Sequence, residues 1–556
     1  MSGPDPVGVV DLDDPACQDV RISGGKAALL ARARARGFPV LDGLVVPAQA
    51  SRRHLDLGAA ALDAGGSGKA RMAVTAAPLG TRLRTALAAE SGRLGDLLAV
   101  RSSAVGEADG TWSGAFSSFL DIRPGEVERA VVGCWASTFT VAAIDRHLAA
   151  ELAPGSMGMA VLIQPQVHPD FAGTARIEHD LVTIAAVAGS PAPLVSGWEP
   201  GEVARVTPDD VVAGAAAELM GDTVLRSVAA MIRDAASLGC WSCEWAVVDG
   251  DLRLLQLLSG GGRQARTPAH VPRGLDTAAA RQVARMTRRF PGPLGEELVL
   301  PWALGAAAPP GPTPPLPIDP RRALDEALRM AARLTAQVWQ LSSDRAGEAA
   351  RSTLRGLRGP EPKRFLDQLA SLSRPDPTLA TDLIARLATV RDASIESGVV
   401  RWPETFWHLD KEQVERALAG SDSHPGRIGF DRWDPFNIGV LTAEGRHARG
   451  LGSSGGVGFG RARWISSPSD KTYLRPREVV VSRHPTPDLA PLLWDAAGVI
   501  TTGGGPGAHL FESARSLGIP AVAGCNLEEV VGSESGIDGM AVAVDGTTGT
   551  IHFTDW

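Results

Sequence analysis

The chain has 556 residues, enough for two to four domains of about 100–200 residues each. Its 44% hydrophobic and 21% charged residues are typical of a globular protein and exclude wholesale disorder. The net charge of -8 argues against binding nucleic acid through a general basic surface. No run reaches the roughly 18 apolar residues of a membrane span, and the N-terminus lacks the apolar core of a secretory signal. We therefore expect a soluble cytoplasmic protein with no nucleic-acid or membrane partner.

Residues 1–265 have the pattern of a mixed α/β unit. An Ala- and Leu-rich helix is expected at 26–36, and short apolar runs typical of buried strands follow it. Cys240 and Cys243 have the spacing of a zinc-ligand pair, but no second pair accompanies them, so we interpret them as small strand residues. The strands are predicted at 43–46, 97–100, 159–163, 182–187 and 245–248, and further helices at 125–135 and 211–238.

The rest of the chain divides into a helical part and a second α/β part. Residues 266–446 contain a proline-rich spacer at 309–320 and apolar residues spaced three and four apart, which indicates helices. Residues 447–556 alternate short strand-like runs with Gly and Pro turns. Helices are predicted at 321–341, 361–373, 376–397, 410–419 and 509–517, and strands at 479–482, 498–501, 521–523 and 540–544.

A glycine pair followed by a lysine is the first candidate phosphate-binding feature. Gly24 and Gly25 are expected to open a helix, where backbone N–H groups can approach phosphate oxygens, and Lys26 adds a positive charge. The segment is not a Walker A loop, and an ordinary helix start remains the alternative. A second Gly-Lys pair, Gly68-Lys69, lies in a Gly/Ser stretch that we interpret as a flexible loop.

Two further segments have groups suited to a nucleotide. Arg101 is expected at the end of a strand, where its guanidinium can hold phosphoryl oxygens. Asp249-Gly250 predicts the turn of a hairpin, across which Glu244 and Gln256 would face each other. A carboxylate beside an amide oxygen suits Mg²⁺ that also contacts ATP phosphates. A surface ion pair and an edge hairpin with polar ends are the respective alternatives.

His509 is the candidate with the most distinctive surroundings. A glycine-rich turn at 502–508 delivers it to the start of a helix. An imidazole presented there can act as a nucleophile, and helix-terminal N–H groups can stabilise a phosphate carried on it. An incidental histidine is the alternative, since the chain has ten others.

Taken together, these segments resemble the pyruvate-phosphate dikinase and phosphoenolpyruvate synthase superfamily. The order of an ATP domain, a central domain and a histidine domain is similar to that of the rifampin phosphotransferases within it. The motifs that carry the resemblance are GGK at 24–26, VRSSA at 100–104, VLIQ at 161–164, EWA to LLQ at 244–256, and GGGPGAHLFESARSLGIPAV at 503–522.

The resemblance implies three domains within an α/β multidomain fold. They are an ATP-grasp nucleotide-binding domain at 1–265, a mainly α-helical substrate or linker domain at 266–446, and a swivelling β/β/α phosphohistidine domain at 447–556. It further implies a dikinase-type, ATP-dependent phosphotransferase with paired acceptors. A phosphoryl group would pass from ATP through His509 to a hydroxyl of a small-molecule acceptor, giving AMP and phosphate.

The resemblance also implies roles for single residues. Lys26 and Arg101 would hold the ATP phosphates, and Gln164 would line the nucleotide pocket. Glu244 and Gln256 would bind ATP and hold Mg²⁺. His509 would be the catalytic residue.

The chain departs from the family pattern at four positions. Ser242 stands where an acidic residue is common, Leu258 where an arginine is usual, Ala192 where a carboxylate is usual, and Ala508 where a serine is usual. Three functions therefore remain open: the phosphotransferase, an ATP-driven condensing or ligating enzyme, and a degenerate non-catalytic homologue. The identity of the acceptor and the oligomeric state are not predicted.

Overall fold

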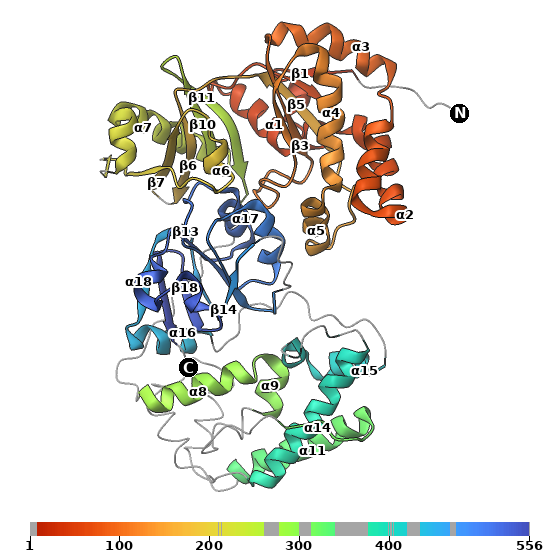
Figure 1. Ribbon diagram of the computed structural model, residues 1–556, viewed down its shortest axis with the longest axis vertical. Helices are drawn as coiled ribbons and strands as arrows, with labels where there is room; N and C mark the ends of the chain where they lie inside the picture. Colours follow the sequence, from red (N-terminus) through yellow and green to blue (C-terminus); the bar gives the residue numbers. More distant parts are fainter. Residues whose placement is uncertain are drawn as a thin grey trace.

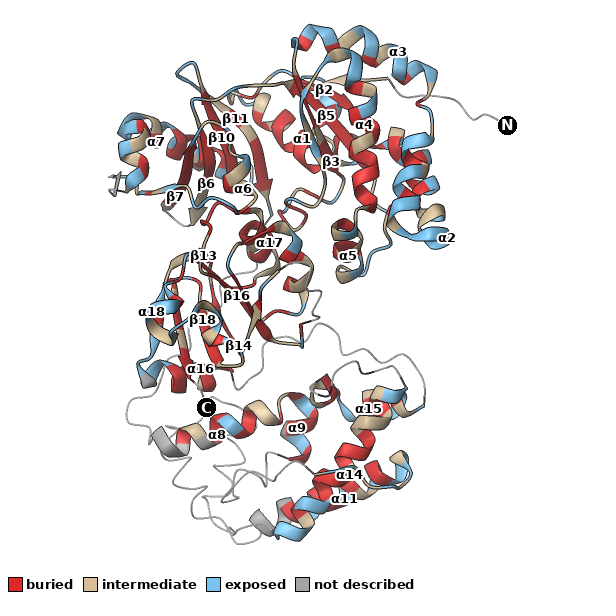
Figure 2. Cartoon of the chain, viewed as in Figure 1, coloured by how far each residue is buried: buried red, intermediate tan, exposed pale blue. Residues whose placement is uncertain are grey.

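The protein has a mixed α/β architecture in several parts, whose order in space differs from their order in the chain. In the computed structural model, the C-terminal sheet lies between the N-terminal half and the central helices (Figure 1). Buried residues concentrate in the three sheets and on the inner faces of the central helices (Figure 2). The structure describes residues 8–178, 180–209, 211–212, 214–260, 277–299, 313–339, 376–397, 400, 403, 405–419, 434–467 and 474–554.

The first sheet of the N-terminal half has five strands in the order β1-β2-β5-β3-β4, and all its pairs are antiparallel. Helix α4 packs on it, and Trp135 of that helix is fully buried and donates to the Met159 carbonyl at 3.0 Å. The strands are β1 Val10–Asp11, β2 Leu44–Val46, β3 Leu98–Ala104, β4 Ser118–Ile122 and β5 Met159–Pro165, and the helices α1 Val20–Arg34, α2 Arg52–Ala76, α3 Thr81–Glu90, α4 Val127–Ala136 and α5 Val141–Ala149.

The second sheet of this half has six strands in the order β11-β10-β6-β7-β8-β9. The long helix α7 covers one face, and α1 contacts both β11 of this sheet and β3 and β5 of the first. Because α1 joins the two sheets, residues near its start lie between them. The elements are β6 Phe171–Glu178, β7 Leu181–Ala188, α6 Ala192–Val195, β8 Glu202–Val206, β9 Val211–Val212, α7 Ala215–Ala236, β10 Cys240–Val248 and β11 Asp251–Ser259.

The central part is helical and has its own apolar core, which includes Phe290, Leu334, Leu383 and Phe406. Helix α16 lies before the domain boundary predicted at 446/447, yet its Ile438 and Leu441 pack against the C-terminal sheet. The helices are α8 Thr277–Arg289, α9 Gly292–Leu298, α11 Pro320–Trp339, α14 Pro377–Glu396, α15 Lys411–Leu418 and α16 Asp434–Glu444.

The C-terminal sheet has eight strands in the order β12-β19-β18-β14-β15-β16-β17-β13. Its middle strands β14 to β17 pair in parallel, and the other pairs are antiparallel. The elements are β12 His447–Arg449, β13 Leu451–Ser454, β14 Val457–Ile465, β15 Glu478–Ser482, β16 Gly498–Thr501, α17 His509–Leu517, β17 Ala521–Ala523, α18 Leu527–Val531, β18 Ala541–Asp545 and β19 Thr550–Thr554.

Most elements expected from sequence are confirmed, with four corrections. Gly24 and Gly25 do not open a helix, because α1 begins at Val20 and is broken at Gly24, where φ is 73°. Arg101 lies in the middle of β3 and not at the end of a strand. The helix predicted at 211–238 begins only at Ala215, because Val211–Val212 pairs with β8 as a strand. Gly68-Lys69 is not a loop: it lies inside α2, which breaks earlier, at Gly65 and Gly66. The helix predicted at 361–373 and the boundary at 265/266 lie outside the described residues.

The length and apolar character of the helices decide whether any of them could cross a membrane. Among the described residues, no single helix has the length and apolar character needed to cross a bilayer, although the bent pair 124–139 and 141–149 meets those requirements jointly. The first helix of that pair is packed in the core of the N-terminal half.

Candidate functional site

A glycine loop positions His509 against the N-terminal half of the chain. His509 is the first residue of α17, directly after the loop that follows β16. A Cβ at Gly505 would overlap the carbonyl oxygen of Pro200, which belongs to the N-terminal half. Gly504 has a positive φ of 69°, a backbone conformation that residues other than glycine rarely adopt. The loop therefore needs glycine for its own turn and for its close approach to the other half.

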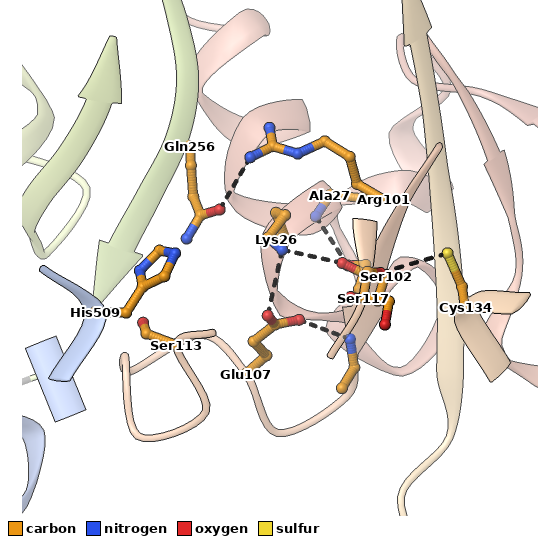
Figure 3. A network of polar contacts seen from close by, with 12 residues as sticks. Lys26, Ala27, Arg101, Ser102, Glu107, Ser113, Ser117, Cys134, Gln256 and His509 are labelled. Carbon is orange, nitrogen blue, oxygen red and sulfur yellow. Dashed lines mark hydrogen bonds and ion pairs between the residues drawn. The ribbon is translucent and has the colours of Figure 1, made fainter. Parts of the chain in front are cut away.

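The imidazole of His509 is almost buried and held through one ring nitrogen. Its side chain is 15% exposed, and its Nδ1 lies 2.8 Å from Oε2 of Glu512, one helical turn later. Burial alone lowers the pKa of His509, but the hydrogen bond and charge of Glu512 outweigh burial and raise it. Figure 3 shows the ring turned toward Gln256 and Lys26. Nδ1 is thus engaged by Glu512, which leaves Nε2 for chemistry.

Lys26 lies in a buried polar pocket, two residues after the break of α1 at Gly24. Its Nζ donates to the Ser102 carbonyl at 3.1 Å and lies 3.3 Å from Oε1 of Glu107. The other oxygen of Glu107 accepts from the Ala104 N–H at 3.0 Å. A Cβ at Gly24 would overlap the Ser103 carbonyl oxygen, so glycine is what lets α1 approach β3 so closely. The sequence-predicted lysine is therefore held against the strand that carries Arg101.

Glu244 and Gln256 face each other as the sequence predicts, and Arg101 reaches both of them from the middle of β3. Glu244 and Gln256 are direct partners across the β10–β11 hairpin. One guanidinium nitrogen of Arg101, Nη2, lies 3.3 Å from both Glu244 Oε2 and Gln256 Oε1. Its other terminal nitrogen, Nη1, donates to the Leu255 carbonyl at 2.7 Å. The carboxylate and the amide oxygen thus converge on one cationic atom.

This pair of oxygens fits a magnesium ion shared with phosphates. Both residues are buried, at 5% and 4% exposed, and both present the hard oxygen donors that Mg²⁺ prefers. Mg²⁺ is commonly bound by one or two protein oxygens together with substrate phosphates and water. The donor set is therefore chemically suited to Mg²⁺, and the metal-binding role of these two residues stays a prediction.

Gln164 is placed differently from the other predicted residues. It is buried in β5, and its amide donates to the Leu41 carbonyl at 3.1 Å. Its Cγ also lies close to Gly43. Within the described part of the chain, both of these contacts connect Gln164 to the 41–43 segment, and neither connects it to Lys26 or Arg101.

Two of the departures from the family pattern are cross-strand partners. Ser242 on β10 lies opposite Leu258 on β11, and both side chains are buried. A Cβ at Gly110 would lie 3.4 Å from both Leu258 Cδ1 and Trp241 Cζ2. The positions where the family commonly has an acid and an arginine are thus directly apposed, and here they form an uncharged pair.

Two arginines that sequence analysis did not identify join the C-terminal part to the N-terminal half. Arg146 of α5 donates to the Ser113 carbonyl at 2.8 Å and to the Pro487 carbonyl at 2.9 Å. Arg176 of β6 donates to the Gly452 carbonyl at 3.0 Å and to that of Ser453. Burial lowers the pKa of both guanidinium groups to about 10.

Side chains of α17 complete this contact. Arg515 pairs with Glu178 and lies over the Trp241 ring, 4.8 Å from its centroid. Ser513 and Ser516 donate to backbone carbonyls of the 109–111 loop. None of these partners stands out in sequence, because most are backbone carbonyls.

Comparisons with known proteins match the two ends of the chain. Residues 20–240 match the family described as pyruvate phosphate dikinase, AMP/ATP-binding domain, and residues 474–549 match the PEP-utilising enzyme, mobile domain. A probable phosphoenolpyruvate synthase of Archaeoglobus fulgidus is 34% identical over 104 residues, 19% of this chain and 13% of that protein. Another, from Staphylothermus marinus, is 33% identical over 152 residues, 27% of this chain and 16% of that protein.

A third relative is an uncharacterized phosphotransferase, YvkC, of Bacillus subtilis. It is 28% identical over an alignment of 193 residues, which covers 30% of this chain and 23% of that protein. The chain thus spans less than a quarter of the length of each of these three relatives. The first family match contains Lys26 and Arg101, and the second contains His509. With both matches in this order, the chain belongs to the pyruvate phosphate dikinase and phosphoenolpyruvate synthase superfamily.

Proposed function

We propose that the protein is an ATP-dependent phosphotransferase of the dikinase type. A phosphoryl group passes from ATP to His509 and then to a hydroxyl of a small-molecule acceptor, with AMP and phosphate as the other products. One observation carries the proposal: the His509 imidazole, which lies in the mobile-domain match, is turned toward Lys26 and Gln256 of the N-terminal half.

The charges around the imidazole support phosphoryl transfer. Lys26 and Arg101 provide positive charge for the phosphates, and such neutralisation with in-line positioning accounts for most catalysis of this reaction. Glu244 and Gln256 would hold Mg²⁺, which when bound supplies further neutralisation of phosphate charge. Gln164 lines the nucleotide pocket in this proposal, at the 41–43 side.

The chemistry at His509 requires the neutral ring. Its Nε2 lone pair forms the N–P bond while a phosphoanhydride P–O bond breaks, and the bonding electron pair leaves on the departing oxygen. Glu512 keeps a proton on Nδ1 and thereby orients the ring. Formation of AMP breaks both phosphoanhydride bonds of ATP, so that one phosphoryl group goes to His509 and the other to water as phosphate.

The proposal includes the finer domain assignments. The N-terminal part acts as an ATP-grasp domain, the central helices contact the acceptor, and the C-terminal part swivels between them, with boundaries near 265/266 and 446/447. In the part of the chain that the structure describes, the C-terminal part contacts the N-terminal half largely through hydrogen bonds to backbone carbonyls, with Arg515 also pairing with Glu178 and lying over the Trp241 ring, and contacts of this kind support mobility. Such a contact can break without exposing a large apolar core.

Labelling of His509 tests the proposal directly. The protein is incubated with Mg²⁺ and ATP labelled in its β- and γ-phosphates, and acid-labile label on the chain is measured. Wild-type protein and the His447→Ala control, altered at an exposed histidine of β12, should both take up label. His509→Ala should take up none. Label that persists in His509→Ala, or no label in the wild type, contradicts the proposal.

The nucleotide products and the acceptor mass complete the test. AMP and phosphate should appear only with protein that carries His509. An acceptor that gains the mass of one phosphate supports transfer, whereas a joined product without phosphorus would indicate condensation.

A further inference from the structure

The loop between β3 and β4 lies along the helix that carries His509. Ser513 of α17 donates to the carbonyls of Gly110 and Thr111 in this loop, at 3.3 and 3.4 Å. Farther along the loop, a Cβ at Gly114 would lie 3.1 Å from Cδ2 of the His509 ring. Cδ2 is bonded to Nε2, the ring nitrogen that is left for chemistry. This part of the loop therefore lies beside the reacting edge of the imidazole.

Ser113, which precedes Gly114, is held by its backbone. Its N–H donates to the Gly110 carbonyl at 3.0 Å, and its carbonyl accepts from Nη1 of Arg146 at 2.8 Å. Ser113 is only 2% exposed, yet its Oγ makes no hydrogen bond to any described residue. An unpaired buried hydroxyl costs free energy, and such groups are rare in folded proteins. The loop thus holds a hydroxyl donor in a fixed position without an acceptor in the described part of the chain.

Aromatic packing stiffens the loop on both sides of Ser113. Trp112 stacks on Phe116, with ring centroids 5.7 Å apart, and its ring centroid lies 4.6 Å from that of His147 on α5. A hydrogen-bond donor that is fixed before a reaction needs little reorganisation during it, which is the condition under which it stabilises a transition state most. The Ser113 hydroxyl meets that condition.

Gly114 leaves space at the reacting edge of the ring. It is exposed, and its φ of 68° lies in the region that favours glycine. A side chain there would crowd both Pro487, 3.0 Å from the added Cβ, and the His509 ring. Figure 3 shows Ser113 beside His509. A phosphoryl group carried on Nε2 would extend from the ring edge that Gly114 borders, within the surroundings of the Ser113 hydroxyl.

We infer that the Ser113 hydroxyl donates a hydrogen bond to the phosphoryl group on its way to Nε2 of His509, so that Ser113 is a further catalytic residue. The inference rests on the proposed function. The hydrogen bond stabilises negative charge on the phosphoryl oxygens, as the cations of Lys26 and Arg101 also do. Because it forms only where the phosphoryl group reaches His509, it raises the rate of transfer and leaves the affinity for ATP unchanged.

The labelling rate of His509 in the full chain tests the inference, at ATP concentrations from limiting to saturating. Ser113→Ala should label about tenfold more slowly at saturation, the effect of one hydrogen bond to a charged group, with the half-saturating ATP concentration of the wild type. Ser113→Cys keeps a similar shape but only a weak donor, so it should be as slow as Ser113→Ala. Ser156→Ala, at an exposed serine before β5, should label like the wild type.

The two Ser113 variants separate hydrogen bonding from packing. A wild-type rate in Ser113→Ala would overturn the inference. So would a wild-type rate in Ser113→Cys together with slow labelling by Ser113→Ala, because that result would assign the defect to the shape of the side chain.

Phosphoramidate separates a failure of this inference from a failure of the proposed function. It phosphorylates imidazoles without a nucleotide: its P–N bond breaks, ammonia leaves, and the new N–P bond forms on the ring. The phosphorus NMR resonance of His509 phosphorylated in this way should shift in Ser113→Ala and stay unchanged in Ser156→Ala.

This shift without any labelling by ATP would contradict the proposed function and still support the contact between Ser113 and the phosphoryl group. The same resonance in the wild type and in Ser113→Ala would overturn the inference. Failure of phosphoramidate to phosphorylate His509 in the folded wild-type protein would overturn it as well, because the ring would then be closed to a phosphoryl group.

Discussion

At the scale of single residues, the glycine loop before His509 could be predicted from sequence, whereas its hydrogen-bond partner Glu512 could not. The glycine loop before it could be recognised, because clustered glycines next to a helix start have a physical use. Its partner Glu512 was not singled out, since a glutamate in the first turn of a helix is ordinary. Only the structure shows that this carboxylate reaches Nδ1 at 2.8 Å and is itself buried. The neighbour of a catalytic candidate was thus harder to predict than the candidate.

Glu512 should set the pH dependence of His509 phosphorylation. Glu512 raises the pKa of His509, so the wild-type ring stays protonated to higher pH and gains its acceptor lone pair only as pH rises through that pKa. Glu512→Gln removes the negative charge and lowers the pKa. The acidic limb of the rate–pH profile should therefore move to lower pH, and the rate at high pH should fall through poorer ring orientation.

The measurement is the initial rate of acid-labile labelling across the neutral range. Glu528→Gln, an exposed glutamate of α18, is the matched control and should keep the wild-type profile. An acidic limb that does not move in Glu512→Gln would mean that Glu512 does not control the proton on His509.

At the scale of elements, the β10–β11 hairpin is where sequence and structure agree most closely. Asp249-Gly250 predicted the turn, whose register holds as far as the Trp245–Leu254 pair; a bulge next to Glu244 then shifts the pairing by one residue and brings Glu244 opposite Gln256. The same register explains the paired departures, because Ser242 and Leu258 are also opposite each other. Sequence revealed each change separately, but only the strand pairing shows that they are one local change.

The pairing predicts a non-additive result when the family residues are restored. Leu258→Arg alone places a charge at a buried position opposite a serine, and an unpaired buried charge can cost about 3–5 kcal/mol. We expect a lower free energy of unfolding and no faster phosphorylation. Adding Ser242→Asp supplies the opposite charge, so the double variant should recover much of the stability and phosphorylate His509 faster than the wild type.

Urea unfolding and labelling rates of the two single variants and the double variant form a double-mutant cycle. Leu258→Met, which stays apolar and close in size, is the control for the change in shape. Additive effects of the two substitutions would contradict a direct interaction between these positions.

At the scale of the whole molecule, sequence indicated the parts but not their arrangement. The helical and α/β textures could be predicted, because periodicity reports local burial. The docking of the C-terminal part on the N-terminal half could not, because Arg146 and Arg176 donate to backbone carbonyls that any residue provides. A surface that depends on backbone shape and close glycine contacts has no compositional signature.

Gly505 provides a test of this docking that leaves every charge in place. A Cβ there would overlap the Pro200 carbonyl oxygen of the other half, while the backbone of Gly505 is outside the positive-φ region. Gly505→Ala should therefore fold but keep the two parts from closing. Because Lys26, Arg101, Glu244 and Gln256 all lie in the N-terminal half, ATP affinity should stay near that of the wild type. The rate of His509 phosphorylation should fall at least about tenfold, which corresponds to about 1.4 kcal/mol of lost docking free energy.

ATP titration and labelling kinetics on the same preparation separate the two effects. Gly68→Ala is the matched control, because a Cβ at Gly68 meets no atom within 4 Å. Wild-type labelling by Gly505→Ala would show that phosphorylation does not need the close approach of Gly505 to Pro200. Loss of ATP affinity together with labelling would instead place the defect in the N-terminal half. Only slow labelling with intact ATP binding agrees with a carrier domain that must dock for its histidine to reach the phosphate.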